Sequence, residues 1–443
     1  MGKEVNEVKE GYKETEIGVL PEDWEVVRLG KVFEEVDRRV NNVKNAASLP
    51  VLSLTKNNGI IPQTERFKKR IATDDLSNYK VVYKKELVYN PYVIWEGAIH
   101  ILNRLEAGLV SPVYPVLSVN KKVADAYFFD FWLRTPSAIK AYSRYASGAV
   151  NRRRAIRKTD FKNIDAPLPP LHEQRKIAYV LSTIQRAIQL QDKVIAATRE
   201  LKKSLMRHLF TYGPVPVDQI DRVPLKETEI GMMPEHWEVV KLGEAIINTQ
   251  YGLSLRGSTN GKYPILRMNN LIEGSINTSD LQYVNLDLQR LERFRLNKGD
   301  ILFNRTNSFE LVGKASLFAL EGDFVFASYL IRIITNKMRL APGFLNYYLN
   351  WDETQHRLKL LASRGVSQSN ISATKLKGFV ISLPLITEQN QIAHILTAVD
   401  NKINAEEKRK STLQSLFQTM LHLLMTGKVR VKDLEVKEDA LRQ

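Results

Sequence analysis

The sequence predicts an α+β protein in which two similar globular domains alternate with two long helices. Two features predict this fold: a set of motifs that occurs twice along the chain, and two runs of about forty residues with the apolar spacing of a helix. We expect a first globular domain at 1–165, a first helical region at 166–222, a second globular domain at 223–382, and a second helical region with a C-terminal tail at 383–443. Matched helices in one chain pair most simply as an antiparallel coiled coil, which would make the molecule pseudo-two-fold symmetric.

The duplication is clearest where each globular domain begins. Lys13–Gly30 and Lys226–Gly243 are identical at fourteen of eighteen positions. Weaker matches continue in register, as when Lys84–Asn90 matches Lys298–Asn304. The offset between matched residues stays between 213 and 216, which is far too long for a solenoid repeat and indicates duplicated domains. We therefore expect both domains to share one fold.

The long helices are predicted at Glu173–Tyr212 and Glu388–Gly427. Each has a narrow apolar stripe at steps of three, four and seven, and no Gly or Pro interrupts either run before its end. A helix of this length needs a partner along its length, although each could instead pack on its own domain. The predicted coiled-coil interface consists of Ile177, Leu181, Ile184, Ile188, Ile195, Leu205, Leu209, Ile392, Leu396, Val399, Ile403, Leu413, Phe417, Met420 and Leu424.

Inside the globular domains the patterns are mixed. Val-rich and Tyr-rich runs at 80–88 and 324–334 predict strands. Helices are predicted at 124–133, 137–145 and 343–361. This mixture is what places the domains in the α+β class.

Composition narrows the range of partners. The 443 residues carry a formal net charge of +16 with a pI of about 9.6, which favours a polyanionic partner. Nucleic acid is favoured over a membrane surface, because no basic amphipathic anchor is visible and no apolar run is long enough to span a bilayer. The absence of Cys excludes disulfides and Cys-based zinc sites, and it suits a cytoplasmic protein.

Candidate DNA contacts lie in basic and polar loops of both domains. Arg and Lys bind phosphates, Arg can bridge guanine O6 and N7, and Asn and Gln form hydrogen bonds with base edges. Each loop could instead be a solvated surface without a DNA contact. In the first domain the candidates are Lys68, Lys69, Arg70, Arg152, Arg153, Arg154, Arg157 and Lys158. In the second domain they are Arg267, Asn269, Asn304, Arg305, Asn307, Arg364, Gln368 and Asn370.

No catalytic or metal site is evident. Asn90-Pro91-Tyr92 has part of the Asn/Asp-Pro-Pro-Tyr/Phe motif of adenine methyltransferases, but the second Pro is missing and the chain has no Gly-x-Gly. We read this segment as a strand that ends in a turn. No phosphate-binding loop exists, and the seven His lack metal-ligand spacing. Two alternatives to a DNA-binding subunit stay open: a self-sufficient DNA adenine methyltransferase, and a coiled-coil scaffold that binds an acidic protein.

Two motifs identify a family resemblance. Each half opens with Pro-Glu-x-Trp-Glu-Val-Val-x-Leu-Gly, and each long helix is preceded by Leu-Pro-x-(Leu/Ile)-x-Glu-Gln-x-x-Ile-Ala, at Leu168 and Leu383. Over nearly its whole length, this layout resembles the specificity subunit of type I restriction-modification systems. The resemblance implies two target-recognition domains, each reading one half of a split asymmetric DNA sequence, joined by an antiparallel coiled coil.

The same resemblance implies partners and an absence of chemistry. Two modification (methyltransferase) subunits are expected to dock on the chain, and restriction subunits are expected to complete the endonuclease. The chain itself would catalyse nothing and hold no cofactor or metal, because S-adenosylmethionine, ATP and magnesium belong to the partner subunits. This expectation agrees with the motif search, which depends on the residues alone.

Overall fold

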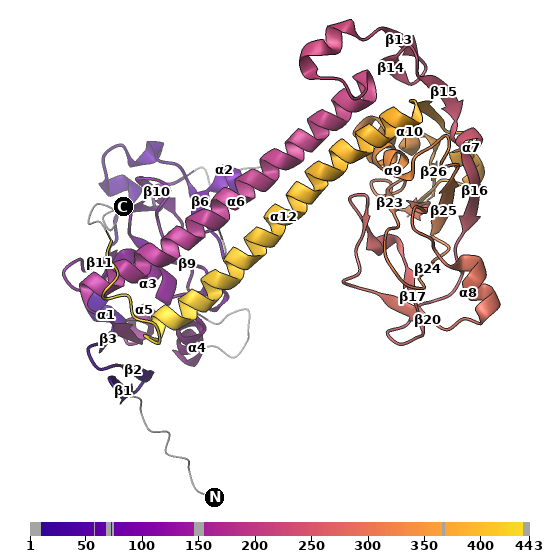
Figure 1. The fold of residues 1–443 in the computed structure, drawn as a ribbon. Helices are drawn as coiled ribbons and strands as arrows, with labels where there is room; N and C mark the ends of the chain where they lie inside the picture. Colours follow the sequence, from indigo (N-terminus) through magenta and orange to yellow (C-terminus); the bar gives the residue numbers. More distant parts are fainter. Residues whose placement is uncertain are drawn as a thin grey trace, which may run out of the picture. The chain divides into compact units, whose positions relative to one another are not determined.

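The computed structural model describes residues 10–56, 58–67, 72, 75–145, 155–365 and 368–436, except for the side chain of Arg364. The chain divides into two compact units (Figure 1). Unit 1 comprises Met1–Gln191 and Arg409–Gln443, and unit 2 comprises Asp192–Lys408. Each unit therefore contains one globular domain and a part of each long helix.

Unit 1 is built around a four-stranded antiparallel sheet of order β4-β11-β8-β9. Strand pairs β1-β2, β3-β12, β5-β6 and β7-β10 surround it. The strands are β1 Tyr12–Thr15, β2 Gly18–Pro21, β3 Glu25–Arg28, β4 Phe33–Glu35, β5 Leu52–Leu54, β6 Ile60–Pro62, β7 Lys80–Tyr83, β8 Leu87–Tyr89, β9 Ile99–Ile101, β10 Ala107–Val110, β11 Val116–Val119 and β12 Asp165–Leu168. The helices are α1 Leu29–Val32, α2 Gln63–Arg66, α3 Ala126–Trp132, α4 Pro136–Tyr145 and α5 Lys158–Lys162.

Unit 2 repeats this plan. Its four-stranded sheet has the order β16-β25-β21-β23, which matches β4-β11-β8-β9 strand for strand. The strands are β13 Leu225–Thr228, β14 Gly231–Pro234, β15 Glu238–Lys241, β16 Ile246–Tyr251, β17 Tyr263–Leu266, β18 Leu271–Ile272, β19 Ser275–Ile276, β20 Gln282–Val284, β21 Ile301–Asn304, β22 Thr306–Asn307, β23 Ala315–Leu317, β24 Val325–Phe326, β25 Leu330–Thr335, β26 Ser363–Arg364, β27 Ser369–Asn370 and β28 Val380–Leu383. The helices are α7 Leu242–Ala245, α8 Leu288–Phe294, α9 Pro342–Asn350, α10 Asp352–Leu361 and α11 Ala373–Lys377. The prediction that both domains share one fold is confirmed.

Three predicted elements are interrupted. The run at 324–334 forms β24 and β25, which belong to different sheets, rather than one strand. The run at 80–88 forms β7 and β8 rather than one strand, because Lys85 turns the chain with a φ of +68°. Gly299 takes the matching position in unit 2 with a φ of +96°, where a residue without Cβ is favoured. The helix predicted at 343–361 is two helices, since Trp351 is extended (φ −68°, ψ 139°) and its ring packs 5.2 Å from that of Phe210.

The long helices are α6 Leu171–Tyr212 and α12 Ile386–Met425. Both are followed by a glycine in the left-handed region, Gly213 at +83° and Gly427 at +66°, as expected for helix C-termini. In unit 1 the first turns of α6 share a core with the last turns of α12, through residues such as Ile177 and Leu424. In unit 2 the pairing is reversed: Leu209, near the end of α6, shares a core with Ile392, near the start of α12. The helices are therefore antiparallel in both units.

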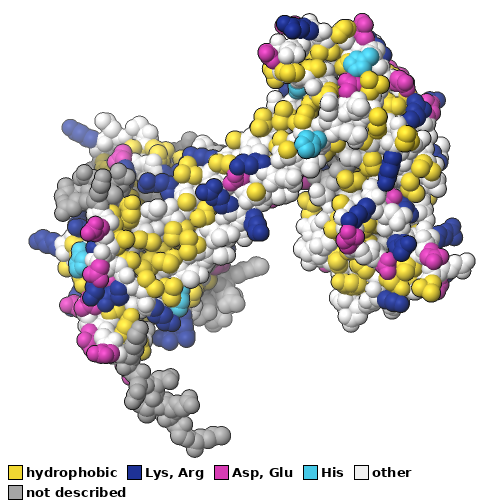
Figure 2. All heavy atoms as spheres, viewed as in Figure 1, with side chains coloured by type: hydrophobic (Ala, Val, Ile, Leu, Met, Phe, Trp, Pro, Cys, Tyr) yellow, Lys and Arg dark blue, Asp and Glu magenta, His cyan; other side chains and the backbone are white. Residues whose placement is uncertain are grey.

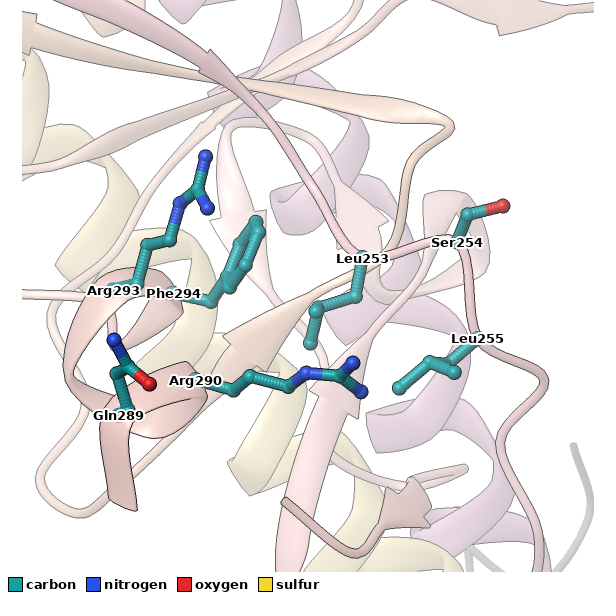
Figure 3. Close-up of a pocket in the computed structure, with 7 residues that line it drawn as sticks. All are labelled: Leu253, Ser254, Leu255, Gln289, Arg290, Arg293 and Phe294. Atoms are coloured by element: carbon teal, nitrogen blue, oxygen red, sulfur yellow. The ribbon is translucent and has the colours of Figure 1, made fainter. Parts of the chain in front are cut away.

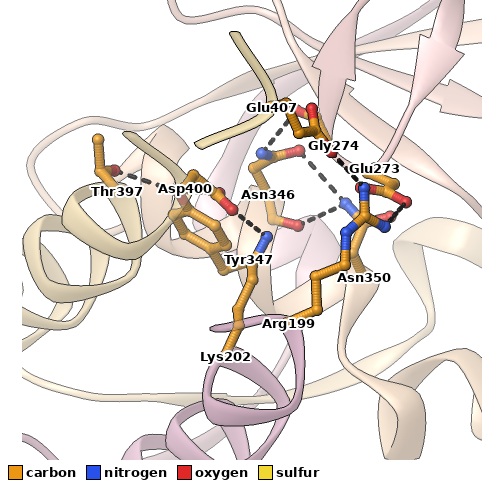
Figure 4. A network of polar contacts seen from close by, with 10 residues as sticks. All are labelled: Arg199, Lys202, Glu273, Gly274, Asn346, Tyr347, Asn350, Thr397, Asp400 and Glu407. Atoms are coloured by element: carbon orange, nitrogen blue, oxygen red, sulfur yellow. Dashed lines mark hydrogen bonds and ion pairs between the residues drawn. The ribbon is translucent and has the colours of Figure 1, made fainter. Parts of the chain in front are cut away.

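The predicted stripe residues face protein in both helices. Of the fifteen, Ile177, Leu181, Leu209, Ile392, Leu396, Ile403 and Leu424 are buried, and the other eight are half-buried. Polar contacts supplement the apolar ones in unit 2 (Figure 4). Lys202 on α6 pairs with Asp400 on α12 at 2.6 Å, and Arg199 on α6 bonds Glu407 at 2.7 Å. Lys202 interrupts the apolar stripe in the sequence, and this ion pair gives the interruption a structural reason.

Candidate nucleic-acid interface

The Glu-Gln pair in the first turn of each long helix fastens that helix to its globular domain. Gln174 is fully buried; its Oε1 accepts from the Asp125 N–H at 2.9 Å, and its Nε2 donates to the carbonyls of Val123 and Pro169. Gln389 repeats this pattern in unit 2, with its Oε1 2.8 Å from the Ala341 nitrogen. Asp125 and Ala341 are the N-caps of α3 and α9. These glutamines therefore connect the long helices to the globular domains and are not available to bind a ligand.

The neighbouring glutamates differ between the units. In unit 1 Glu173 accepts from Trp24 Nε1 at 3.0 Å and from Arg430 at 2.8 and 2.7 Å, and Arg430 also bonds Asp23. Burial opposes the charge of Glu173, but these donors prevail and lower the pKa of its carboxyl group. In unit 2 the matching Glu388 accepts from His236 instead. We call Asp23, Trp24, Glu173 and Arg430 the unit 1 clamp.

In unit 2, two of the predicted polar loops meet in one small sheet. Strand β27 pairs with β22 on one side and β26 on the other, so that Thr306 and Ser363 both lie opposite Asn370. The Asn370 Nδ2 donates to Thr306 Oγ1 at 2.6 Å. The structure thus brings residues 304–308, 363–365 and 368–370, about sixty residues apart in the chain, into one polar surface. We call β22, β26 and β27 with Arg305 the polar sheet.

Arg305 directly precedes β22 at the edge of the polar sheet. Its guanidinium carbon lies 4.7 Å from the ring centroid of Tyr251, Nη1 donates to the Ser328 carbonyl at 3.4 Å, and Nη2 donates to Asn370 Oδ1 at 3.3 Å. The side chain is half-buried, and its Nε is covered without a hydrogen-bond acceptor. Among the described residues, no carboxylate forms an ion pair with Arg305. A partly desolvated cation in this state favours an added anion or strong acceptor.

A second basic feature borders α8, in a hollow of about 460 Å³. Leu253, Leu255 and Phe294 give it apolar walls, and Arg290 and Arg293 add two guanidinium groups (Figure 3). Arg290 has only a loose pair with Asp287 at 3.8 Å, and Arg293 has no ion pair with any described carboxylate. The strand that ends at Tyr251 continues directly into Leu253, so the chain itself connects the polar sheet to the hollow.

Other predicted contacts in unit 2 have structural roles or stand alone. The Arg267 side chain pairs with Asp280 at 2.9 Å, and its backbone N–H donates to Asn270 Oδ1 at 2.9 Å. Asn269 beside it is exposed, as is Gln368 at the tip of the polar sheet. Asn304 is buried, at 2 % exposure, and Asn307 Oδ1 accepts from the Ser308 N–H. For Arg364 only the backbone, in β26, is described.

The family of the chain follows from comparison with known proteins. A sequence model described as the type I restriction modification DNA specificity domain matches twice, at residues 21–198 and 234–415. The type I restriction enzyme MjaVIII specificity subunit of Methanocaldococcus jannaschii is 29% identical over 96% of this chain and 97% of that protein. The type I restriction enzyme EcoKI specificity subunit of Escherichia coli is 26% identical over 62% of this chain and 59% of that protein. The chain belongs to the type I restriction-modification specificity family.

Solved structures agree on the fold. The type I restriction-modification S subunit from M. genitalium has a TM-score of 0.54 at 15% identity, covering 90% of this chain and 96% of that one. A chain from a structural study of complex assembly in a type I R-M system has a TM-score of 0.53 at 17% identity, covering 93% and 99%. As a type I specificity protein, the chain recognises DNA sequence for a complex with other restriction-modification subunits and is not itself catalytic. The alternative of a self-sufficient methyltransferase is therefore wrong.

In unit 1 of this specificity protein, most of the predicted basic contacts lie outside the described residues. These are Lys68, Lys69, Arg70, Arg152, Arg153 and Arg154. Arg157 is described and bonds Asp160 at 2.7 Å, and Lys158 pairs with Glu35. Both cations therefore already have carboxylate partners.

The Asn90-Pro91-Tyr92 segment is a turn after β8, as predicted. Asn90 Oδ1 accepts from the Tyr92 N–H at 3.0 Å, and Asn90 Nδ2 donates to the Tyr114 hydroxyl at 3.3 Å. The Pro91 carbonyl accepts from the Ile156 N–H, just as the Arg305 carbonyl accepts from the Ile371 N–H. The chain from Ile156 onward therefore joins unit 1 at the position where the chain from Ile371 onward joins unit 2.

Sequence reasoning missed four residues of the unit 2 surface. Tyr251 and Tyr329 flank Arg305 and are 43% and 47% exposed, and Arg290 and Arg293 line the hollow. The spacing of Arg290 and Arg293, three residues apart on a short helix, was a usable signal; nothing in the sequence distinguished the tyrosines. Lys and Arg are scattered over both units on the face shown in Figure 2 rather than gathered in one patch. In the described segments, no His, Asp and Glu cluster could hold a metal ion and no helix is apolar enough to cross a bilayer.

Proposed function

We propose that this chain is the DNA-reading subunit of a type I restriction-modification complex in which unit 1 and unit 2 each recognise one part of a split, asymmetric sequence. The observation that carries the proposal is the half-buried Arg305 guanidinium, which lies on a polar sheet beside two exposed tyrosines and has no carboxylate partner in the described chain. Duplicated scaffolds with different loops suit two different half-sites. Pro91 and Tyr92, for example, stand where unit 2 has Arg305 and Thr306.

The two basic features of unit 2 suit different parts of DNA. Arg290 and Arg293 are near the surface and loosely held, which suits phosphate contacts that supply affinity without reading sequence. The polar sheet offers hydroxyl, amide and guanidinium groups on fixed backbone, which suits hydrogen bonds to base edges. In unit 1 the corresponding contacts would come from the loops at 68–70 and 152–154.

The proposed protein partners are two modification subunits, with restriction subunits completing the endonuclease. Val194, Ala197 and Leu201 form a second apolar stripe on α6, spaced by three and four residues and left exposed. Val194 is 42% and Leu201 53% exposed, which suits a helix-packing contact with a modification subunit. The chain would need no cofactor, because S-adenosylmethionine, ATP and magnesium would be held by the partner subunits.

The decisive experiment is to assay the purified chain with and without modification subunits from the same host. With them, the complex should methylate adenines in one split motif of a random DNA library, and binding should weaken steeply with salt. The chain alone should transfer no methyl group. Methyl transfer by the chain alone would contradict the proposal. Assembly without any sequence preference would support the scaffold alternative.

The proposed docking stripe has its own test. Val194→Glu with Leu201→Glu should leave the chain folded but prevent capture of modification subunits, because charges cannot enter an apolar helix interface. Met338→Glu, at an 85% exposed apolar residue outside both long helices, is the matched control and should assemble normally. Normal assembly of the double variant would exclude the stripe as the docking surface.

A further inference from the structure

We propose that Arg305 determines specificity by reading a guanine in the half-site bound by unit 2, an inference that depends on the proposed function. Arg305 would recognise this base in only one of the two half-sites.

The backbone of Arg305 is held on both sides. Its N–H donates to the Tyr329 carbonyl at 3.1 Å, and its carbonyl accepts from the Ile371 N–H at 2.9 Å. The guanidinium is also restrained, by the Tyr251 ring at 4.7 Å and by the Ser328 and Asn370 oxygens. Little side-chain freedom is left to lose on binding DNA, which favours a contact that requires a defined orientation.

The absence of a carboxylate partner in the described chain distinguishes Arg305 from four other arginines of unit 2. Arg267, Arg295 and Arg339 each form an ion pair with an Asp or Glu, at 2.9, 3.5 and 3.1 Å. Arg332, which is buried, pairs with Asp300 at 2.6 Å. Arg305 is half-buried, yet its two hydrogen bonds within the chain are long and go to neutral oxygens. Its charge is therefore available to a ligand.

The geometry favours a base over a phosphate. Nη1 and Nη2 each use one N–H within the protein, at 3.4 and 3.3 Å, and each retains a second. Two N–H groups from one planar fork match guanine O6 and N7, the acceptor pair that Arg bridges in the major groove. Tyr329, whose carbonyl accepts from the Arg305 N–H, is 47% exposed, and the Asn370 amide bonds the guanidinium group. Both residues suit contact with base faces and edges. The exposed Arg290 and Arg293 are better suited to phosphates.

The first half-site should lack this contact. The residue matched to Arg305 is Pro91, which has no hydrogen-bond donor in its side chain or on its nitrogen. A guanine requirement that comes from Arg305 should therefore appear in only one part of the split motif.

The test uses the full chain assembled with its modification subunits. Methylation of a random library by wild type, Arg305→Lys, Arg305→Ala and the control Arg339→Ala gives the motif of each. Wild type and Arg339→Ala should require a G·C pair at one position that both Arg305 variants accept with any base. Binding of the cognate site should fall about ten- to a hundredfold in Arg305→Lys, which keeps the charge but cannot bridge two acceptors. The other half of the motif should be unchanged.

A substituted base then isolates the contact. In wild type, 7-deazaguanine at that position should weaken binding about tenfold, since it removes N7, whereas Arg305→Ala should bind both DNAs equally. Variants that lose affinity equally for all sequences would show a phosphate contact and overturn the proposal, as would indifference of wild type to 7-deazaguanine throughout that half-site. In either case a split motif from wild type would leave the proposed function standing, and its absence would overturn that function instead.

Discussion

The unit 1 clamp predicts a pH-dependent loss of stability in one unit only. Arg430→Ala removes the bonds at 2.8 and 2.7 Å to Glu173, whose side chain is 1% exposed. The variant would leave a buried carboxylate with Trp24 as its remaining donor in the clamp. Loss of one partner from a buried ion pair costs about 3–5 kcal/mol, and we expect about 3 kcal/mol because Arg430 is 21% exposed.

The dependence on pH follows from the pKa of Glu173. Its folded pKa lies below the ordinary value of 4.5, so the clamp contributes stability above that pH and loses it as pH falls through the folded value. Without Arg430, burial would raise the pKa of Glu173, and the carboxyl group would take a proton more readily. The deficit of the variant should therefore be full at pH 7. It should shrink as the pH falls through the raised pKa of Glu173 in the variant and then towards the lowered pKa of wild type.

Hydrogen exchange with mass spectrometry resolves the two units. Peptides of the unit 1 core should lose about 3 kcal/mol of protection at pH 7, while those of unit 2 stay unchanged. Lys428→Ala, an exposed residue of the same segment, is the control and should behave as wild type. Equal protection in Arg430→Ala and wild type at neutral pH would refute the clamp. A deficit of the same size in acid would refute the role of the Glu173 charge.

Three further outcomes follow from features of the two units. Arg290→Ala with Arg293→Ala should lower the salt slope of DNA binding by about 1.8 and weaken all sequences alike, as expected for two lost phosphate contacts; a change in the methylated motif would contradict this. Gln389→Ala should destabilise unit 2 by about 3 kcal/mol in chemical denaturation, and Gln174→Ala should destabilise unit 1 by the same amount. Each substitution leaves three backbone groups without their hydrogen-bond partner. If both variants were as stable as wild type, the glutamines would not fasten the helices. Burial lowers the pKa of His100, so unit 1 should lose stability as the pH falls below 6.5, and His100→Gln should lessen that loss in thermal melts; an unchanged pH profile would exclude it.

The architecture was accessible from the sequence because its signals are internal to the chain. The apolar spacing of α6 and α12 and their closing glycines depend on local residues, and the repeated opening segments allow each half to predict the other. The same repeat also predicts the break in the strand at 80–88. Gly299 marks a positive-φ turn, and its counterpart Lys85 is where the predicted strand breaks.

The candidate site was only partly accessible, because long-range partners decide which charges are free. Arg157 has its carboxylate three residues away, at Asp160, whereas Lys158 pairs with Glu35 far earlier in the chain. The significance of Arg305 depends on Tyr251 and Asn370, which come from distant strands. The net positive charge of the chain predicts a negatively charged partner. Only the packed structure shows which guanidinium groups are paired with a carboxylate and which can bind that partner.

Unit 1 is formed by two segments that are far apart in the chain, and this has a consequence for its synthesis. Unit 2 is continuous, so it can complete its core while residues after Lys408 are still being added by the ribosome. Unit 1 contains Leu424 and Met425 in its core and Arg430 in its clamp, so its earlier residues must wait for the last part of the chain. A truncated product would therefore display apolar surface from its first domain, the state that chaperones and proteases recognise.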